Sequence, residues 1–279
     1  MGTVFEVQYL RACGAADSPH LELEKQIQDR LDTIEASMSL YQSKSEISRL
    51  NRQGHLDDLS PDFRSVLEQA LDYSKLTEGY FDITIWSVLE EIQASFKKHG
   101  RPPEPTKLQP YAKLVDSALV QLEGSTIKFS RPGVKVSTDG IAKGYAVDEV
   151  AEYLLERGVS NFLINFSGNI RTHGKKVDGQ WKVAIQNPLT GEIFDIDLRQ
   201  GAVASSGLEY ASYSKDHKWH HLINPRTLLP ARELAGSSVA GPSATVCDAL
   251  STAVLVMGRK NADRILSKNF PHYRFWTFK

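Results

Sequence analysis

A lysine in the first turn of a predicted helix is the first residue of this sequence that could do chemistry. Residues 137–158 read STDGIAKGYAVDEVAEYLLERG, with Asp139 and Gly140 just before Lys143. Apolar residues recur at helical spacing and a glycine stands at the expected end: Val147, Val150, Ala151, Leu154 and Gly158. The free N–H groups and positive dipole of such a helix start suit an anion such as a phosphate. The lysine could equally be only solvated, and the Gly-x-x-x-x-Gly-Lys-Ser/Thr phosphate loop is absent.

Three side chains that carry oxygen form a second candidate group in the segment TVCDALSTAVLVMG. Asp248, Ser251 and Thr252 are spaced at i, i+3 and i+4, so a helix would place them on one face. Carboxylate and hydroxyl oxygens suit hard cations such as Mg²⁺ or Ca²⁺, and no pair of His or Cys residues nearby favours zinc. Alternatively, Asp248 caps the helix and the two hydroxyl residues fill small gaps in the core.

A histidine in KWHHLINPRT is the third candidate. Pro225 fixes a turn after a short apolar strand, and His221 alternates with Leu222, which aims the imidazole away from the apolar face. A lone histidine is often structural, with its hydrogen bonds satisfied by the protein. A neutral imidazole beside a metal-bound phosphate would instead be a suitable general base.

Alternating helices and strands are predicted to position these groups. TVFEVQYL at residues 3–10 has the pattern of a half-buried strand, and the apolar positions of a helix follow at Leu23, Ile27, Leu31 and Ile34. Residues 39–54 form a polar break, and Ser60 with Pro61 begins another helix. Short strands are predicted in ALVQLEG, TIKFS, VKVS, NFLINF and WKVAIQN. The Pro- and Lys-rich residues 94–107 are predicted to be a surface loop within a single domain.

Composition excludes several classes of protein. Of 279 residues, 41% are apolar, and 33 Lys and Arg residues balance 34 Asp and Glu residues. No overall basic field therefore favours nucleic acid or an anionic membrane surface. Cys13 and Cys247 are far apart, which argues against a disulfide scaffold or a structural zinc site. No apolar run reaches the roughly 20 residues that span a bilayer.

Several segments together resemble one family along nearly the whole chain. They are MGTVFEV, MSLYQSKSEISRLN, TEGYFDIT, GIAKGYAVD, SSG, HLINPRT and CDALSTA, in that order. GIAKGYAVD matches the most distinctive signature of the ApbE-type FAD:protein FMN transferases, and the other segments are similar to that family's remaining motifs. Motifs in the right order are much more specific than any one of them.

The resemblance implies both a fold and an activity. The fold is α+β: a single ApbE-like domain over residues 1–279, related to the T-fold, with mixed or antiparallel sheets packed against helices. The activity is Mg²⁺-dependent transfer of FMN from FAD to a threonine of a partner protein, with release of AMP. Two alternatives stay open: an FAD pyrophosphatase that yields FMN and AMP, and a non-catalytic FAD-binding protein. Either reaction requires positioning and charge neutralisation at a phosphoryl group.

The resemblance also assigns residues to a site. His221 is expected to assist deprotonation of the incoming threonine. The metal ligands are expected to be Gly140, through its carbonyl, and Asp248, Ser251 and Thr252. FAD is expected to contact Met1, Tyr41, Tyr80, Phe81, Asp82, Ser137, Asp139, Lys143 and Leu222.

Some positions depart from the family pattern. Ser137, Thr138, Asp139 and Gly140 replace an Asp-Leu-Gly-Gly sequence, so the acidic residue is displaced by two positions. Ser167, Gly168 and Asn169 replace Gly-Gly-Asp, which removes another carboxylate. Ile83 stands for a proline and Leu228 for a glycine. These changes predict a divergent member whose FAD pose or acceptor differs.

The resemblance further suggests partners and a location. The acceptor is expected to carry an Asp-x-x-Thr motif and to be a redox subunit. In the family, the Met-Gly-Thr strand follows a signal peptide or a lipid anchor, so a trimmed leader is expected here. The predicted location is the bacterial periplasm or the inner membrane, with the cytoplasm as the alternative.

Overall fold

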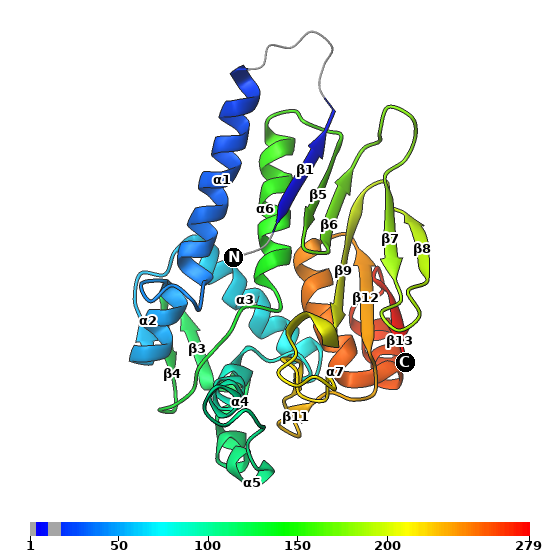
Figure 1. Cartoon of the computed structure of the whole chain (residues 1–279). Helices are drawn as coiled ribbons and strands as arrows, with labels where there is room; N and C mark the ends of the chain where they lie inside the picture. Colours follow the sequence, from blue (N-terminus) through cyan, green and yellow to red (C-terminus); the bar gives the residue numbers. More distant parts are fainter. Residues whose placement is uncertain (1–3, 11–17) are drawn as a thin grey trace.

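A six-stranded antiparallel sheet forms the centre of the protein in a computed structural model that describes residues 4–10 and 18–279 (Figure 1). The strand order is β1-β5-β6-β9-β12-β13. The strands are β1 (Phe5–Tyr9), β5 (Phe162–Phe166), β6 (Asn169–His173), β9 (Gly201–Gly207), β12 (Gly236–Gly241) and β13 (Arg274–Phe278). In register, Phe5 lies opposite Phe166, and Ser205 lies opposite Ser238. Strands from both ends of the chain therefore belong to one sheet, in a single α+β domain.

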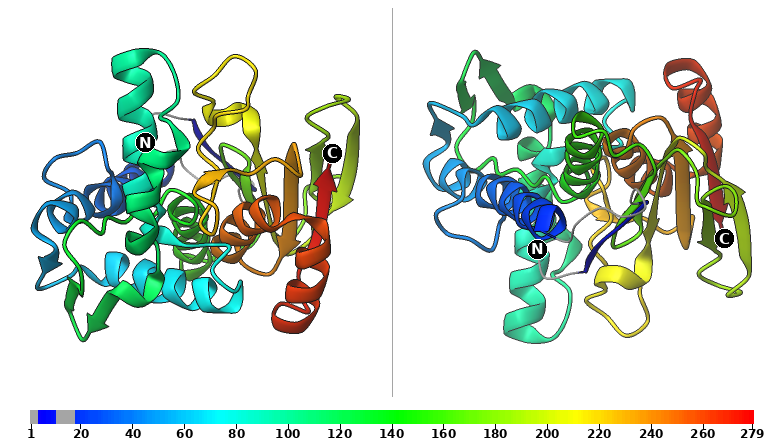
Figure 2. Two further views of the ribbon diagram at one scale, coloured as in Figure 1. Left: turned by 90° about the horizontal axis from the view of Figure 1, so that it is seen from below. Right: turned by 90° about the horizontal axis from the view of Figure 1, so that it is seen from above.

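Both faces of this sheet are covered, as Figures 1 and 2 show. The covering elements are α6 (Ala142–Glu156), α7 (Ala244–Asn269), β7 (Lys182–Gln186) and β8 (Ile193–Asp197). Successive side chains of β9 point to opposite faces: Ala202 and Ala204 join the main core with α6 and α7, whereas Val203 packs with the β7–β8 hairpin. Burial on both faces explains why residues 202–204 of β9 are apolar without polar alternation.

A second layer of helices packs on the outer side of α6. It contains α1 (Ser18–Met38), α2 (Glu46–Gln53), α3 (Pro61–Leu76) and a small sheet of β2 (His55–Leu56), β3 (Val120–Glu123) and β4 (Thr126–Phe129) in the order β2-β4-β3. Ile34 of α1, Phe63 of α3 and Val147 of α6 are fully buried in the main core. Helices that are far apart in sequence therefore share one hydrophobic core with the sheet.

A smaller apolar cluster lies under the helix α4. Two segments of the chain contain the elements of this region. The first has η1 (Ile83–Ile85), α4 (Trp86–His99), α5 (Pro105–Leu108), η2 (Gln109–Leu114) and η3 (Ser117–Leu119), and the second has η4 (Leu208–Ala211), β10 (Ile223–Asn224) and β11 (Leu229–Pro230). Val88 and Ile92 of α4 pack with Leu108, Ile223 and Leu228. This cluster attaches α4 to the segment that follows His221.

Most of the predicted elements are confirmed. The strand pattern at residues 3–10 corresponds to β1, and the helix predicted from about Ile141 begins at Ala142 as α6. Ser60 caps α3 by accepting the Phe63 N–H at 3.3 Å. Among the described residues, no helix is both long enough and apolar enough to cross a membrane.

Three predictions of local structure are wrong. Residues 94–107 are not a loop throughout, because α4 continues to His99 and α5 begins at Pro105. The polar residues 39–54 contain the helix α2, which Ser45 caps at its start. Residues 134–137 form no strand, because their N–H groups bond to the side chains of Asn51 and Ser87 and to the carbonyl of Ile83.

Candidate active site

The first turn of α6 holds Lys143 beside the loop that precedes the helix. The Thr138 carbonyl accepts the N–H groups of Ile141 and Ala142 at 3.0 and 2.8 Å, which starts the helix. No side chain caps this end. The Lys143 ammonium donates to the Asp139 carbonyl at 3.1 Å and stays partly exposed. A lysine cation and a helix N-terminus therefore occupy the same place, as an anion site requires.

The helices α6 and α7 come into direct contact one residue after this lysine. The Gly144 N–H donates to Asp248 Oδ2 at 3.0 Å, although the two residues are 104 positions apart. A Cβ atom at Gly144 would lie only 2.3 Å from the Ala244 carbonyl oxygen and 2.8 Å from the Asp248 Cβ. Glycine is therefore required here for close approach, and this approach places the Asp248 carboxylate at the start of α6.

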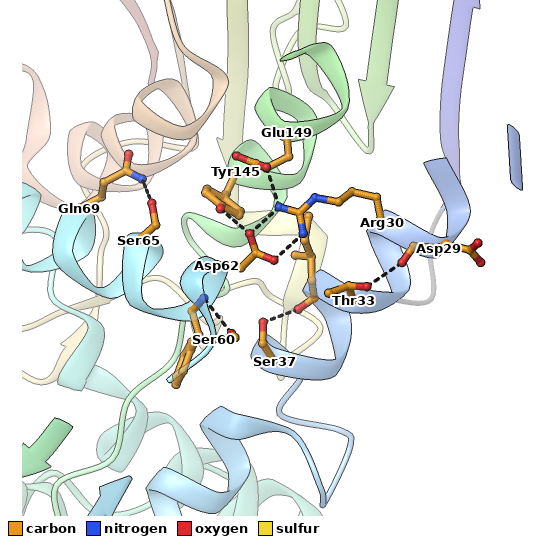
Figure 3. Close-up of polar contacts among 12 residues, drawn as sticks. Asp29, Arg30, Thr33, Ser37, Ser60, Asp62, Ser65, Gln69, Tyr145 and Glu149 are labelled. Carbon is orange, nitrogen blue, oxygen red and sulfur yellow. Dashed lines mark hydrogen bonds and ion pairs between the residues drawn. The ribbon is translucent and has the colours of Figure 1, made fainter. Parts of the chain in front are cut away.

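A network of charged side chains fixes α6 against α1 and α3 (Figure 3). Arg30 of α1 contacts both Asp62 of α3 and Glu149 of α6, the latter at 2.6 Å. The Tyr145 hydroxyl donates to Asp62 at 2.7 Å. Burial alone would raise the pKa of Asp62, but the hydrogen bonds from Arg30 and Tyr145 outweigh it and lower that pKa. The helix α6, which carries Lys143, is thus held by α1 and α3 through these contacts and by α7 through the bond from Gly144 to Asp248.

The hydroxyl groups predicted as metal ligands lie on the same face of α7 as Asp248. The Ser251 hydroxyl donates to the Asp248 carbonyl at 2.9 Å and contacts the Ser206 hydroxyl at 2.8 Å. Thr252 Oγ1 is 3.4 Å from the Ser206 hydroxyl. A Cβ atom added at Gly140 would lie 3.3 Å from Thr252 Oγ1. Gly140 therefore brings its backbone next to Thr252, whereas the Ser251 hydroxyl is already occupied within the protein.

Asp248 has an environment that favours a bound cation. Burial raises its pKa, while Lys143, the Gly144 N–H and a hydrogen bond from Asn169 lower it only in part. Asn169 is 2% exposed, and its Oδ1 has no hydrogen-bond partner. A carboxylate, a hydroxyl and an unpaired amide oxygen are the donors that a hard cation prefers, so these residues fit Mg²⁺.

The described residues contain no group of three or more His, Cys, Asp and Glu side chains that could hold a metal ion. Any cation at Asp248 would therefore be held by at most two such side chains and otherwise by neutral oxygens. Mg²⁺ sites with few carboxylates usually take their remaining ligands from substrate phosphates and water. The donor set thus fits a cation that binds together with a nucleotide.

His221 has the geometry of a general base. Its Nδ1 lies 3.2 Å from the Ala211 carbonyl, which can only accept, so Nδ1 carries the proton. No described residue bonds to Nε2, which leaves that nitrogen's lone pair available. Desolvation and the charge of Lys143 lower the pKa of His221, despite the opposing hydrogen bond to Ala211. The imidazole is therefore neutral at pH 7.

The neighbouring His220 has a structural role. It is 1% exposed, its Nε2 donates to the Ala231 carbonyl at 2.9 Å, and its Nδ1 accepts the Leu222 N–H at 3.2 Å. Desolvation lowers its pKa to about 4. Both nitrogens are occupied, so His220 ties the Leu222 backbone, next to His221, to the Ala231 carbonyl.

The residues predicted to contact FAD through the TEGYFD segment differ in their surroundings. Phe81 is 4% exposed and approaches Gly140, since a Cβ there would lie 3.2 Å from the Phe81 ring. The Tyr80 ring lies under the Arg226 guanidinium, 4.0 Å from ring centroid to Cζ. The Asp82 carboxylate accepts N–H groups of Thr84 and Ser117 at 2.8 and 3.0 Å. These contacts point to a structural role for Asp82 and leave its predicted FAD contact without support.

The other predicted FAD contacts fall into three groups. Tyr41 is 92% exposed, and desolvation raises the pKa of Tyr213, with smaller contributions from Tyr41 and Asp139. Ser137 and Leu222 are buried, and the Ser137 hydroxyl accepts the Asp139 N–H at 3.1 Å. Met1 lies outside the described residues.

Electrostatic interactions connect Lys143 with Asp139, Asp248 and His221. Desolvation raises the pKa of Asp139 and Asp248 and lowers that of His221, and the charge of Lys143 acts on all three groups, which come from three separate segments. At Asp139, an exposed residue, desolvation outweighs the attraction of Lys143, so its pKa is raised. The fold therefore collects a cation, two carboxylates and a neutral imidazole at the start of α6.

Two residues of the site were not predicted as functional, Ser206 and Asn169. Ser206 lies in the SSG segment, and the likeness of that segment to a family motif was the signal that could have identified it. Asn169 stands where the family pattern has a carboxylate, and it was interpreted only as a loss of charge. Its contact with Asp248 joins β6 to α7, two elements far apart in the chain, so it has no local signal in the sequence.

Comparisons with known proteins find relatives along nearly the whole chain. A sequence model of the ApbE family matches residues 1–275. A protein from Haemophilus influenzae named FAD:protein FMN transferase is 33% identical, covering 96% of this chain and 82% of the relative. One of the same name from Vibrio cholerae is 29% identical, with 96% and 83% covered.

Solved structures give the same result. The flavin transferase ApbE from Vibrio cholerae is 27% identical, with a TM-score of 0.84 over 100% of this chain and 94% of its own. The apo form of the flavinyl transferase ApbE from Pseudomonas stutzeri, at 23% identity, supports the fold with a TM-score of 0.85 over 100% of this chain and 92% of its own. The chain therefore belongs to the ApbE family.

Proposed function

We propose that this protein is a Mg²⁺-dependent FAD:protein FMN transferase, which attaches FMN to a threonine of an acceptor protein and releases AMP. The observation that carries the proposal is the convergence of Lys143, Asp248 and the unprotonated Nε2 of His221 at the start of α6. Relatives that cover most of the chain carry this name. A cation, a base and an anion site together are what phosphoryl transfer requires.

Each group has a distinct task in the proposed reaction. The N–H groups at the start of α6 and the Lys143 ammonium bind the pyrophosphate of FAD and orient it. His221 Nε2 takes the proton of the acceptor threonine as its hydroxyl oxygen bonds to the FMN phosphorus. The bond from that phosphorus to the bridging oxygen breaks, and AMP leaves with the bridging oxygen and its electron pair. Lys143 stabilises the charge that develops on this leaving group.

A Mg²⁺ ion would be held by the Asp248 carboxylate, the Thr252 hydroxyl and the Gly140 carbonyl, with Asn169 beside them. When bound, it would supply positive charge for the phosphoryl oxygens. Ser251 fits a supporting role better than direct ligation, because its hydroxyl bonds to Ser206 and to the Asp248 carbonyl. We propose that Ser251 orients the α7 turn that carries Asp248 and Thr252.

The acceptor and the location complete the proposal. The exposed Tyr41 ring offers a stacking surface for the isoalloxazine ring of FAD at the rim of the site. The acceptor is proposed to present an Asp-x-x-Thr motif on a redox subunit. Periplasmic or inner-membrane location stays a prediction, and fractionation of cells that express the full-length protein would check it.

Mass spectrometry of a transfer reaction tests the proposed function. The protein is incubated with FAD and Mg²⁺, with and without a peptide that contains Asp-x-x-Thr, and with EDTA as a control. A peptide heavier by one FMN, together with AMP, supports transfer. FMN and AMP without a labelled peptide would instead show a pyrophosphatase, and unchanged FAD that co-purifies with the protein would show a binding protein. Transfer that persists in EDTA would refute the metal requirement.

A further inference from the structure

The side chain of Asp148 holds the first turn of α7, although it belongs to α6. Its Oδ2 accepts the Ser243 hydroxyl at 2.7 Å and the N–H and hydroxyl of Thr245 at 2.9 and 2.7 Å. Its Oδ1 accepts the Ala244 N–H at 3.0 Å. One carboxylate thus satisfies two of the free N–H groups of α7, and its negative charge faces the positive end of that helix dipole.

Arg171 of β6 fixes this carboxylate from the other side. Its guanidinium donates to Asp148 Oδ1 at 2.8 Å and to Glu152 at 2.7 Å. The side chains of Asp148 and Arg171 are 15% and 17% exposed, so their ion pair is largely shielded from water. The carboxylate therefore has partners on β6 and on α7 with its N-cap residue, and it has little freedom to turn.

The contacts between α6 and α7 form a crossed pair. Gly144 of α6 bonds to Asp248 of α7, and Asp148 of α6 bonds to Ala244 of α7. On each helix the two positions are four residues apart, which is about one turn. Two contacts one turn apart fix both the separation of the helices and the register between them. The position of Asp248 relative to Lys143 depends on that register.

We propose that Asp148 is a positioning residue that sets this register and thereby places the Asp248 carboxylate beside Lys143. The proposal extends the transferase function proposed above, but its structural part does not depend on that function. Asp148 itself lies one helical turn beyond the site and has no role in proton transfer. Its effect on the reaction is transmitted through the first turn of α7.

The Gly144 amide provides a direct test, because its N–H is protected by Asp248. In Asp148→Asn, one acceptor oxygen is replaced by an NH₂ group that cannot accept the N–H and hydroxyl groups of α7. We expect exchange of the Gly144 amide hydrogen, measured by NMR or mass spectrometry, to become faster by about tenfold. Glu152→Gln is the matched control, since Glu152 shares Arg171 but does not touch α7. Its Gly144 exchange should equal that of the wild-type protein.

Kinetic constants give a second readout that general destabilisation would not reproduce. At a temperature where circular dichroism shows Asp148→Asn to be folded, we expect kcat for AMP release to fall by about tenfold, with the KM for FAD changed by less than about threefold. Thr245→Val removes one of the hydrogen bonds to Asp148 and should show a smaller effect in the same direction. It therefore serves as the test variant if Asp148→Asn fails to fold.

The outcomes separate this inference from the proposed function. Wild-type exchange at Gly144 in folded Asp148→Asn, or in Thr245→Val if Asp148→Asn does not fold, would overturn the inference whatever reaction the protein catalyses. Faster exchange in Asp148→Asn with unchanged Glu152→Gln would support it even if no FMN transfer were found. Faster exchange with unchanged kcat would refute the link between the register and catalysis.

Discussion

Replacement of Gly144 by alanine should separate α6 from α7 and damage the site from within. The added Cβ would lie 2.3 Å from the Ala244 carbonyl oxygen, whereas ordinary contacts begin at 3.4 Å. Relief of this overlap requires the helices to move apart by roughly 1 Å, because neither partner is the flexible end of a side chain. The Gly144 hydrogen bond to Asp248, now 3.0 Å, would be lost or lengthened by that movement.

The size of the effect follows from two opposing terms. Overpacking of a tight contact costs about 3 kcal/mol, and alanine improves the helix interior by about 1 kcal/mol relative to glycine. The net loss of about 2 kcal/mol should lower the Tm by about 5 °C. Displacement of Asp248 from Lys143 by roughly 1 Å should reduce kcat by about 100-fold.

Two assays measure this prediction on the same preparation. Differential scanning calorimetry gives the Tm, and release of AMP from FAD with Mg²⁺ and acceptor gives kcat. Glu156→Ala, on the exposed end of the same helix, is the control and should change neither value. Wild-type Tm and kcat in Gly144→Ala would refute the argument that this contact fixes the site.

Three further predictions concern single groups. Urea unfolding of the wild-type protein and of His220→Gln should show different pH dependences. Between pH 7.5 and 5.5, the free energy of unfolding should fall by about 1 kcal/mol less in His220→Gln than in the wild type. The folded pKa of about 4 is below the usual value of 6.5, so stability present above pH 6.5 is lost as the pH falls toward 4; equal slopes would contradict this. Asp248→Asn should abolish transfer yet raise the Tm of the metal-free protein. Burial raises the pKa of Asp248, so its ionised form destabilises the fold, and the gain in Tm should grow as the pH rises. A lower Tm in Asp248→Asn would contradict this. Gly140→Ala should leave the Tm within about 2 °C but raise the Mg²⁺ concentration for half-maximal activity, because the methyl group crowds Thr252; an unchanged Mg²⁺ requirement would refute that ligand position.

The parts of the fold that depend on local patterns could be predicted from the sequence. The strand at Phe5–Tyr9 alternates, and α6 shows a 3.6-residue period that ends at Gly158, whose φ is +76°. The spacing of Asp248 and Thr252 likewise predicted one helix face, because both lie within a single turn. In each case, a few neighbouring residues contain the whole signal.

The polar segments were predicted less well for a physical reason. The helix α2 has few apolar residues, and only Ile47 and Leu50 are buried. Its Ser45 cap and the left-handed Gly54 at its end decide its limits. Residues 134–137 look like a strand but have no strand partner, and only the folded chain could show that side chains take their N–H groups.

The contacts between distant segments could not be predicted from the sequence. The bond from Gly144 to Asp248 spans 104 positions, and the bond from Ala244 to Asp148 spans 96. The residues involved belong to different helices, and the pattern within one helix does not show which residues of the other helix it contacts. The motif GIAKGYAVD pointed to the right helix, but it did not show that its second glycine, Gly144, and its last residue, Asp148, form hydrogen bonds with α7.

The charges at the start of α6 explain why one lysine and one buried carboxylate can form a substrate-dependent site. Burial raises the pKa of Asp248, and Lys143 offsets this only in part, so the ionised carboxylate lacks positive charge in the free protein. A divalent cation would supply that charge, but it would then leave an excess of positive charge beside Lys143. The pyrophosphate of FAD would balance this excess. We therefore expect the metal and the nucleotide to bind together, because each would balance the charge that the other brings.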